Sequence, residues 1–146
     1  MAYCGGSGNT LPLVIFGLRA KSEQIKAVSK IALVPGWFGI NEPVTFGMPI
    51  MYNPILCIPY ILNVILVMIC SLIGYKTGFL IPGFIPIMTL LPMGFGSFLT
   101  TLNWRNAIWD YLMMIPAGIV WYPFFKAYDN QLYKQEQAAA AAEKAA

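Results

Sequence analysis

Hydrophobic residues run almost without interruption through the middle of this chain, and charged residues lie between the runs or near the two ends. Within residues 31–75 the one charged residue is Glu42, and residues 77–104 carry none. A third uncharged run covers residues 111–125. Because a helix needs roughly 20 apolar residues to cross a bilayer, the pattern predicts an all-α integral membrane protein.

The apolar runs differ in how often proline and glycine interrupt them. Residues 54–75 and 107–125 predict transmembrane helices, the second with Trp and Tyr placed as interfacial anchors. Residues 31–52 and 77–103 are broken repeatedly by Pro and Gly, which end or kink helices. Irregular backbone at membrane depth is buried in protein or lines a wet cavity. We therefore expect two re-entrant helical hairpins, and four full spans fit the pattern as well.

Basic residues indicate how the chain is oriented. A basic cluster precedes the first broken segment, and further lysines follow the last span; they are Arg19, Lys21, Lys26, Lys30, Lys126 and Lys134. Lys and Arg mark the cytoplasmic side of membrane proteins. We therefore expect a multi-pass protein of a cell membrane with its C-terminus in the cytoplasm and an even number of crossings between the two basic regions.

Composition excludes several classes of partner. Of the 146 residues, 58% are hydrophobic and 10% charged, whereas soluble domains carry about a quarter charged residues. A net charge of +3 without a basic, aromatic stripe does not indicate nucleic acid. The chain has no histidine, and Cys4, Cys57 and Cys70 follow no metal-ligand or redox spacing. We expect no metal and no cofactor, with the lipid bilayer as surroundings.

Glu42 is the candidate functional residue, because it is a lone carboxylate in a long apolar stretch rich in Pro and Gly. A carboxylate facing lipid costs on the order of 2.5–3.5 kcal/mol, so such residues normally face a cavity. Asn41 beside it adds a donor and an acceptor. Together they suit sugar hydroxyls, which both donate and accept hydrogen bonds.

The same residues carry a family resemblance. Residues 39–50 read GINEPVTFGMPI and are followed by Asn53-Pro54. This segment resembles the signature of the lactose/cellobiose (diacetylchitobiose) type of enzyme IIC in the phosphoenolpyruvate-dependent sugar phosphotransferase system. The Gly5–Gly8 segment, the Asn103-Trp104-Arg105 turn and the closing residues 122–126, YPFFK, follow in the family's order. The resemblance covers the chain to about Tyr133.

The resemblance implies a sugar permease of the bacterial cell membrane. In this family the first half of the protein forms a dimeric scaffold, and the second half binds a disaccharide. The motif glutamate, here Glu42, contacts the hydroxyl that receives a phosphoryl group from a phosphocysteine on a separate IIB protein. Glu42 would act either as a general base or by orienting the hydroxyl. The chain would thus be a transport subunit of a phosphotransferase complex, with a disaccharide and phosphorylated IIB as partners and a homodimer in the full-length form.

Two departures from the family affect the expected site. The histidine that accompanies the motif glutamate is missing, since the chain has none. The tryptophan of the second hairpin is replaced by Met88-Thr89-Leu90. Phe84 is the expected substitute for sugar stacking, and Thr89 is an expected polar contact. Trp104 is expected to anchor a turn in preference to touching the sugar.

The family's members are much longer than this chain. We expect residues 1–133 to be the membrane-embedded, sugar-binding half of the enzyme IIC fold without its N-terminal scaffold, and residues 134–146 to be an Ala-rich cytoplasmic tail. On this view the chain is a fragment, a broken gene product or half of a split transporter. It would not transport alone.

Two other functions compete with this reading. One is a small, non-transporting membrane protein with an interaction or structural role, which leaves the uncharged surroundings of Glu42 unexplained. The other is a self-contained enzyme, for which the sequence offers no nucleophile–base pair, metal set or phosphate-cradling loop.

Overall fold

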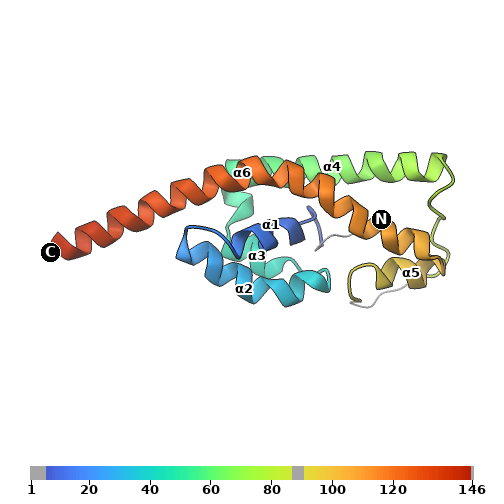
Figure 1. The fold of residues 1–146 in the computed structure, drawn as a ribbon, viewed down its shortest axis with the longest axis horizontal. Coiled ribbons are helices and arrows are strands. Elements are labelled where there is room, and N and C mark those ends of the chain that lie inside the picture. Colours follow the sequence, from blue (N-terminus) through green and yellow to red (C-terminus); the bar gives the residue numbers. More distant parts are fainter. Residues whose placement is uncertain (1–5, 87–90, 146) are drawn as a thin grey trace.

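The computed structural model describes residues 6–86 and 91–145, with side chains described as far as residue 142. All regular structure in these ranges is helical (Figure 1), which confirms the predicted all-α class. In chain order the elements are α1 (Leu11–Gly17), α2 (Glu23–Trp37), α3 (Glu42–Gly47), the 3-10 turn η1 (Ile50–Tyr52), α4 (Pro54–Lys76), α5 (Phe95–Thr101) and α6 (Trp104–Ala145).

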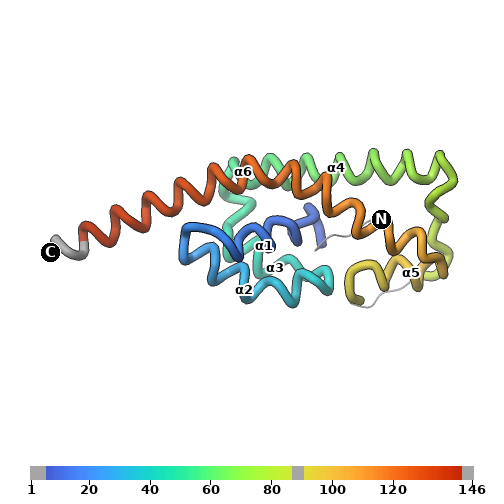
Figure 2. The backbone as a smooth tube through the Cα atoms, viewed as in Figure 1, coloured from blue at the N-terminus to red at the C-terminus, as the bar shows by residue number. Residues whose placement is uncertain are grey.

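The long helix α6 runs the length of the molecule, and the other elements are arranged along it (Figures 1 and 2). Helices α1, α4 and α5 all pack directly against α6. The pair α2 and α3 packs together, with α2 against α1 and η1 linking α3 to α4. The C-terminal part of α6 extends beyond the other helices (Figure 2).

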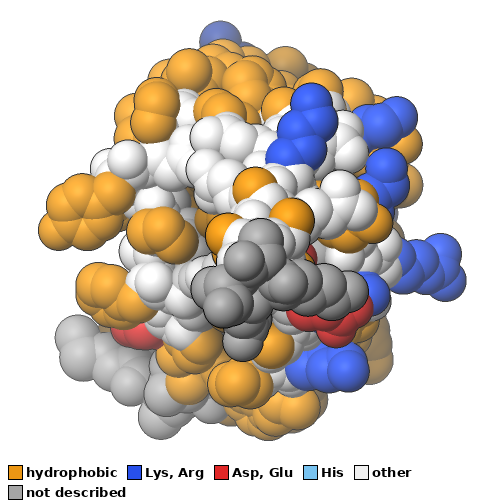
Figure 3. Space-filling view, turned by 90° about the vertical axis from the view of Figure 1, so that its left-hand side faces the viewer, with side chains coloured by type: hydrophobic (Ala, Val, Ile, Leu, Met, Phe, Trp, Pro, Cys, Tyr) orange, Lys and Arg blue, Asp and Glu red, His pale blue; other side chains and the backbone are white. Residues whose placement is uncertain are grey.

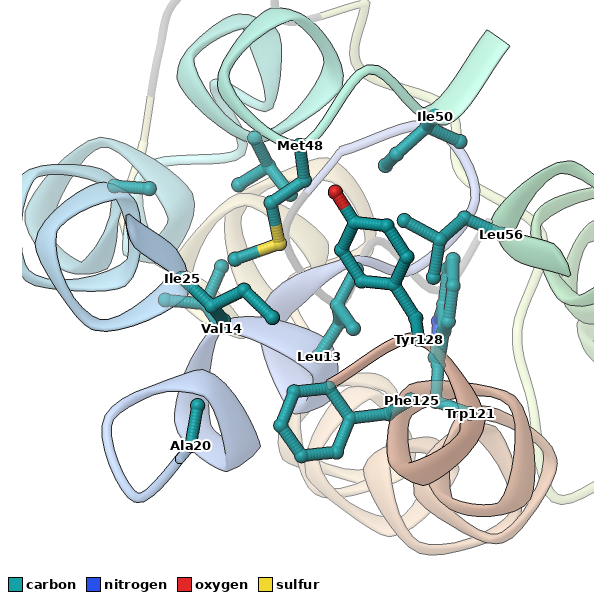
Figure 4. Close-up of a cluster of buried hydrophobic side chains, with 12 residues drawn as sticks. Leu13, Val14, Ala20, Ile25, Met48, Ile50, Leu56, Trp121, Phe125 and Tyr128 are labelled. Carbon is teal, nitrogen blue, oxygen red and sulfur yellow. The ribbon is translucent and has the colours of Figure 1, made fainter. Parts of the chain in front are cut away.

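The main core lies where α1, α2, α3 and the middle of α6 meet (Figure 4). Trp121 is fully buried there, and its indole N–H donates to the carbonyls of Asn9 at 3.0 Å and Gly8 at 3.3 Å. Burying one large apolar side chain contributes about 1.5–3 kcal/mol. The other buried members are Leu13, Val14, Ala20, Ile25, Ala32, Val44, Met48, Ile50, Leu56, Phe125 and Tyr128. This core fixes the short helices of the N-terminal half on α6.

Helix α4 agrees closely with the span predicted for residues 54–75. Pro54 occupies its first turn, where the missing N–H has no partner to lose. The Asn53 side chain caps the helix by accepting from the Ile55 N–H at 3.0 Å. Among the described helices α4 is the one long and apolar enough to cross a membrane. Many of its large apolar side chains are exposed, including Ile61, Ile65 and Ile69.

The second predicted span is helical but is not a separate element. Residues 107–125 lie inside α6, which passes through Pro116 and Pro123 and continues to Ala145. The Asp, Pro, Trp and Tyr residues of this stretch reduce its hydropathy, and it does not reach the level of α4. The expected boundary between residues 133 and 134 falls within the same unbroken helix.

The first broken segment begins with a helix that also includes the preceding basic residues. Helix α2 starts at Glu23, contains Pro35 and ends at Trp37, so the expected boundary at residue 31 is absent. The chain then turns into the short helix α3 and the turn η1. A proline near the end of a helix removes one late hydrogen bond only, which explains why α2 continues through it.

Two carboxylates of α6 bond to the N-terminus of α2. Asp129 accepts from the backbone N–H of Lys21 at 2.9 and 3.0 Å and from that of Ser22 at 3.0 Å. Glu136, two turns further on, accepts from the Ser22 hydroxyl at 2.6 Å and from the amides of Glu23 and Gln24 at 3.2 Å. The first N–H groups of a helix lack intrahelical partners. Asp129 is buried where it makes these contacts.

Replacing Asp129 with Ala should destabilise the protein, because the buried N–H of Ser22 and the part-buried N–H of Lys21 lose their acceptor. The expected loss is about 1–3 kcal/mol. It is measured as the free energy of unfolding of the purified chain in detergent. Gln131→Ala, at an exposed position of the same helix, is the matched control and should change stability little. Equal stability of the two variants would contradict the capping role.

The hydrogen bonds of Glu136 should make the free energy of unfolding depend on pH. The hydrogen bond from Ser22 is the largest influence, and it lowers the pKa of Glu136 below its ordinary 4.5. A carboxylate with a lowered folded-state pKa stabilises the fold above its unfolded pKa, and the contribution is lost as pH falls through the folded pKa. The stability difference between the wild type and Glu136→Gln should thus be present at neutral pH and disappear on acidification below pH 4.5. A difference that grows on acidification would exclude this contribution.

Candidate functional site

The turn between α2 and α3 places the predicted residues Asn41 and Glu42. Gly39 has a positive φ of 82°, which favours glycine and lets the chain reverse after α2. The amide of Ile40 donates to the Pro35 carbonyl at 3.0 Å and closes the turn. Asn41 is the N-cap residue of α3, and its side-chain Nδ2 donates to the Ser7 carbonyl at 2.8 Å. The turn is therefore tied to the glycine-rich segment before α1.

Glu42 is the first residue of α3 and its side chain is exposed. Its carboxylate forms no hydrogen bond or ion pair with the part of the chain that the structure describes. A negative charge in the first turn of a helix lies at the positive end of the helix dipole, which stabilises it. The carboxylate is accordingly open to an approaching ligand.

A cavity of about 480 Å³ lies beside this turn. Its walls come from the α2–α3 turn, the end of α4, the segment between α4 and α5, α5 itself and the start of α6. Pockets of this size hold small-molecule ligands. The lining residues are Phe38, Gly39, Tyr75, Gly83, Ile85, Pro86, Leu91, Pro92, Met93, Gly94, Gly96, Ser97, Thr100, Thr101, Asn106 and Asp110.

Side chains of α6 hold the irregular wall of the cavity in place. The Asn106 amide bonds both backbone groups of Ile81, accepting from its N–H at 3.2 Å and donating to its carbonyl at 2.9 Å. The Tyr111 hydroxyl donates to the Met93 carbonyl at 2.9 Å, while the Met93 amide donates to the Trp37 carbonyl at 2.9 Å. One helix thus fixes both sides of the second broken segment.

Among the described residues that line this cavity, Asp110 is the one with a charged side chain. It is buried on α6 and accepts a short hydrogen bond from the Ser97 hydroxyl on α5. Neither residue was among the expected site residues. Asp110 immediately precedes the third uncharged run, so the same signal that singled out Glu42, a lone carboxylate in apolar surroundings, could have found it.

The structure does not bring all the predicted residues into one cavity. The residues preceding Asn41 and Glu42 line the cavity, but neither residue does so itself. Phe84 is exposed, and its amide donates to the Thr100 carbonyl at 3.2 Å, so its neighbours Gly83 and Ile85 line the cavity instead. Thr89 lies outside the described residues. The roles of these four residues remain predictions.

A membrane-length helix, proline-broken segments and a polar cavity between them are the features of a membrane transporter. Comparison with known proteins agrees with this class. The model of the family "Phosphotransferase system, EIIC" matches residues 1–64. The crystal structure of the transporter ChbC, the IIC component of the N,N'-diacetylchitobiose-specific phosphotransferase system, superimposes with a TM-score of 0.86 at 35% identity, covering 92% of this chain and 32% of that one.

Curated relatives give the same result. The lichenan permease IIC component of Bacillus subtilis (strain 168) is 38% identical over 135 residues, covering 90% of this chain and 30% of the relative. The cellobiose-specific EIIC component of Geobacillus stearothermophilus is 37% identical over 139 residues, covering 93% of this chain and 31% of the relative. Over most of its length the chain is thus similar to one part of the EIIC components of the phosphotransferase system, which are integral membrane permeases of the bacterial plasma membrane. It spans about a third of the length of these relatives.

The two hydrogen bonds between Asn106 and Ile81 lead to a prediction about hydrogen exchange at the Ile81 amide. Asn106→Ala removes the two part-buried hydrogen bonds of the Ile81 N–H and carbonyl, and losing one hydrogen bond costs about 0.5–1.5 kcal/mol. Hydrogen exchange at the Ile81 amide should therefore accelerate. Asn130→Ala, on the same helix but with a solvent-exposed side-chain contact to Lys21, is the control. Unchanged exchange at Ile81 would show that the amide does not hold this segment.

Proposed function

We propose that this chain forms part of the IIC permease of a phosphoenolpyruvate-dependent phosphotransferase system. In this role it binds a cellobiose-like disaccharide and presents it for phosphorylation during uptake. The observation that carries the proposal is the cavity whose wall includes Phe38 and Gly39, in the turn that leads to Asn41 and Glu42 at the start of α3. The likeness to permeases for lichenan and cellobiose supports this choice of substrate.

Glu42 is the residue that contacts the reacting hydroxyl in this proposal. A carboxylate accepts a hydrogen bond from a sugar hydroxyl and orients its oxygen towards phosphorus. It also serves as a general base if it takes the hydroxyl proton during attack. Its exposure and its freedom from partners among the described residues suit both roles. Asn41 lies beside it as a polar contact, with Phe84 and Thr89 as further contacts on the second broken segment.

The phosphoryl group comes from a phosphorylated IIB protein. Among the relatives, the lactose-specific EIICB component of Lacticaseibacillus casei, 37% identical over 146 residues, joins the two components in one chain. This supports a IIB protein as the partner of the present chain. A homodimer of the complete permease belongs to the same proposal, and nucleic acid has no part in it.

The two basic regions lie on the same side of the membrane in this proposal. The Lys21 ammonium lies 3.4 Å from the Asn130 side-chain oxygen, so the α1–α2 turn and the distal part of α6 meet. Lys and Arg side chains gather on one side of this end of the molecule (Figure 3). An even number of crossings would separate these regions, with α4 and residues 107–125 as spans and the broken segments as re-entrant hairpins. The C-terminus is then cytoplasmic.

Within this arrangement residues 1–133 form the membrane-embedded, sugar-binding part, and residues 134–146 extend into the cytoplasm. Supporting this division, the side chains from Tyr133 to Gln135 and from Gln137 to Ala142 are exposed. Glu136 is the exception, since it reaches back to α2. The relatives' additional length would supply the scaffold.

The first test is sugar uptake and phosphorylation in cells that lack their own permease. The chain is expressed alone and together with the part of the lichenan permease that it does not match, and labelled cellobiose is supplied. Activity only in the combined cells would support a partial permease. A chain that reaches the membrane but gives no uptake in either case would favour a non-transporting membrane protein.

Glu42→Gln in the active combination should abolish phosphorylation while leaving the chain in the membrane. A general base contributes about 10²- to 10⁴-fold to the rate, whereas an orienting role would leave more activity because the amide still bonds a hydroxyl. Glu23→Gln, which removes an exposed carboxylate from α2, is the matched control. Normal uptake by Glu42→Gln would exclude both roles.

A further inference from the structure

A second cavity, of about 360 Å³, shares one lining residue with the cavity described above. That residue is Tyr75, in the last turn of α4. One wall of the second cavity is the glycine-rich segment of residues 6–9, and another is the face of α4 between Val64 and Tyr75. Cavities of a few hundred Å³ hold small-molecule ligands. One side chain therefore lies at the junction of two spaces, each of which has the volume for a ligand or a part of one.

Ser71 brings an unpaired hydroxyl to the second cavity. The residue lines this cavity and lies four positions before Tyr75, so both side chains are on the same face of α4. It is buried, with 8% of its surface exposed, and its hydroxyl forms no hydrogen bond with any described residue. Burying a polar group without a partner is unfavourable. An occupant that offers a hydrogen bond therefore satisfies a group that the fold leaves unpaired.

The ring of Tyr75 is available to a ligand as well. Within residues 6–86 and 91–142 it packs against no other aromatic ring, and the residue is 38% exposed. Its backbone is fixed, because the Gly78 amide donates to the Tyr75 carbonyl at 3.1 Å. The face of an aromatic ring carries partial negative charge and attracts the weakly positive C–H groups of a sugar ring. An aromatic face beside an unpaired hydroxyl suits a hexose, which presents C–H groups on its face and O–H groups around its edge.

A sugar unit satisfies this cavity better than a lipid chain does. The other α4 residues on its wall are Val64, Val67, Met68 and Leu72, which an acyl chain would also contact. An acyl chain, however, leaves the Ser71 hydroxyl buried without a partner, and a hexose does not. The arrangement of one hydroxyl and one ring on an otherwise apolar wall thus favours a carbohydrate.

We propose that Ser71 and Tyr75 form a second subsite, which binds the third hexose unit of an oligosaccharide longer than a disaccharide. The Ser71 hydroxyl bonds a hydroxyl of that unit. The Tyr75 ring packs against the sugar where the ligand passes from the first cavity into the second. This inference rests on the proposed function and deepens it, because it extends the substrate class from disaccharides to trisaccharides.

Competition by cellobiose and by cellotriose tests the subsite. Each sugar is added unlabelled to the combined cells described above, and uptake of labelled cellobiose is measured. Ser71→Ala should weaken competition by cellotriose about 2- to 10-fold. It should leave competition by cellobiose unchanged, because Ser71 does not line the first cavity.

Tyr75 provides a second, independent variant. Tyr75→Leu removes the ring and should also weaken competition by cellotriose about 2- to 10-fold. Tyr75→Phe keeps the ring and should compete like the wild type. The pair therefore separates loss of the aromatic face from loss of the phenolic hydroxyl.

Ser29→Ala and Tyr133→Leu are the matched controls. Ser29 is a buried serine of α2 whose hydroxyl also has no partner in the described part of the chain, and it lines neither cavity. Tyr133 lies on α6 with 37% exposure, close to that of Tyr75, and it too lines neither cavity. Both variants should keep wild-type competition by the two sugars.

The outcomes distinguish this inference from the proposed function. Cellotriose that competes equally well in the wild type, Ser71→Ala and Tyr75→Leu would overturn the second subsite alone. Cellobiose uptake that cellotriose does not inhibit in the wild type would do the same. A wild-type combination that takes up no sugar would overturn the proposed function and this inference with it. Weaker competition by cellotriose in Ser71→Ala and Tyr75→Leu, with both controls unchanged, would establish the subsite.

Discussion

Side chains of helix α6 bond the backbone at four separate places in the described structure. Asn106 holds Ile81, Tyr111 holds Met93, and Trp121 donates to the carbonyls before α1. Asp129 and Glu136 accept hydrogen bonds from backbone N–H groups at the N-terminal end of α2. All five side chains belong to α6. Buried backbone groups left unpaired cost about as much as a lost hydrogen bond. The irregular segments are tolerated because α6 supplies the partners that their own backbone lacks.

This arrangement also explains why the cavity exists. A regular helix between α4 and α5 would satisfy its own backbone and pack closely against α6. Instead the chain has no regular secondary structure in residues 81–86, and the Asn106 amide takes the place of helical hydrogen bonds at Ile81. Gly94, with a φ of 81°, lets the chain turn into α5, and a side chain there would collide with the Tyr111 ring. The open space between these fixed points is lined by Ser97, Asp110 and their neighbours.

The sequence predicted some of these features well and others not at all. Helix α4 was predicted almost to the residue because a continuous apolar run follows an Asn-Pro start. The extent of α6 was missed, since the change to polar residues after Phe125 indicates an end to the span, and the helix continues past it. The bonds of Asp129 to Lys21 and Ser22 join positions 107 or 108 residues apart, and no local pattern contains them. Glu42 was found because charge is rare around it, while Asp110 was overlooked at the edge of an apolar run.

The two carboxylates near the cavity differ in a way that suits different tasks. Asp110 is buried and already bonded by Ser97, so any change of partner there disturbs a desolvated group and is costly. Glu42 lies exposed at the start of a helix, where water replaces a departing ligand at little cost. A group that must meet a hydroxyl before phosphorylation and release it afterwards needs such exchange. The exposed position of Glu42 therefore suits the role that we propose for it, whereas the buried carboxylate of Asp110 holds α5 on α6 through Ser97.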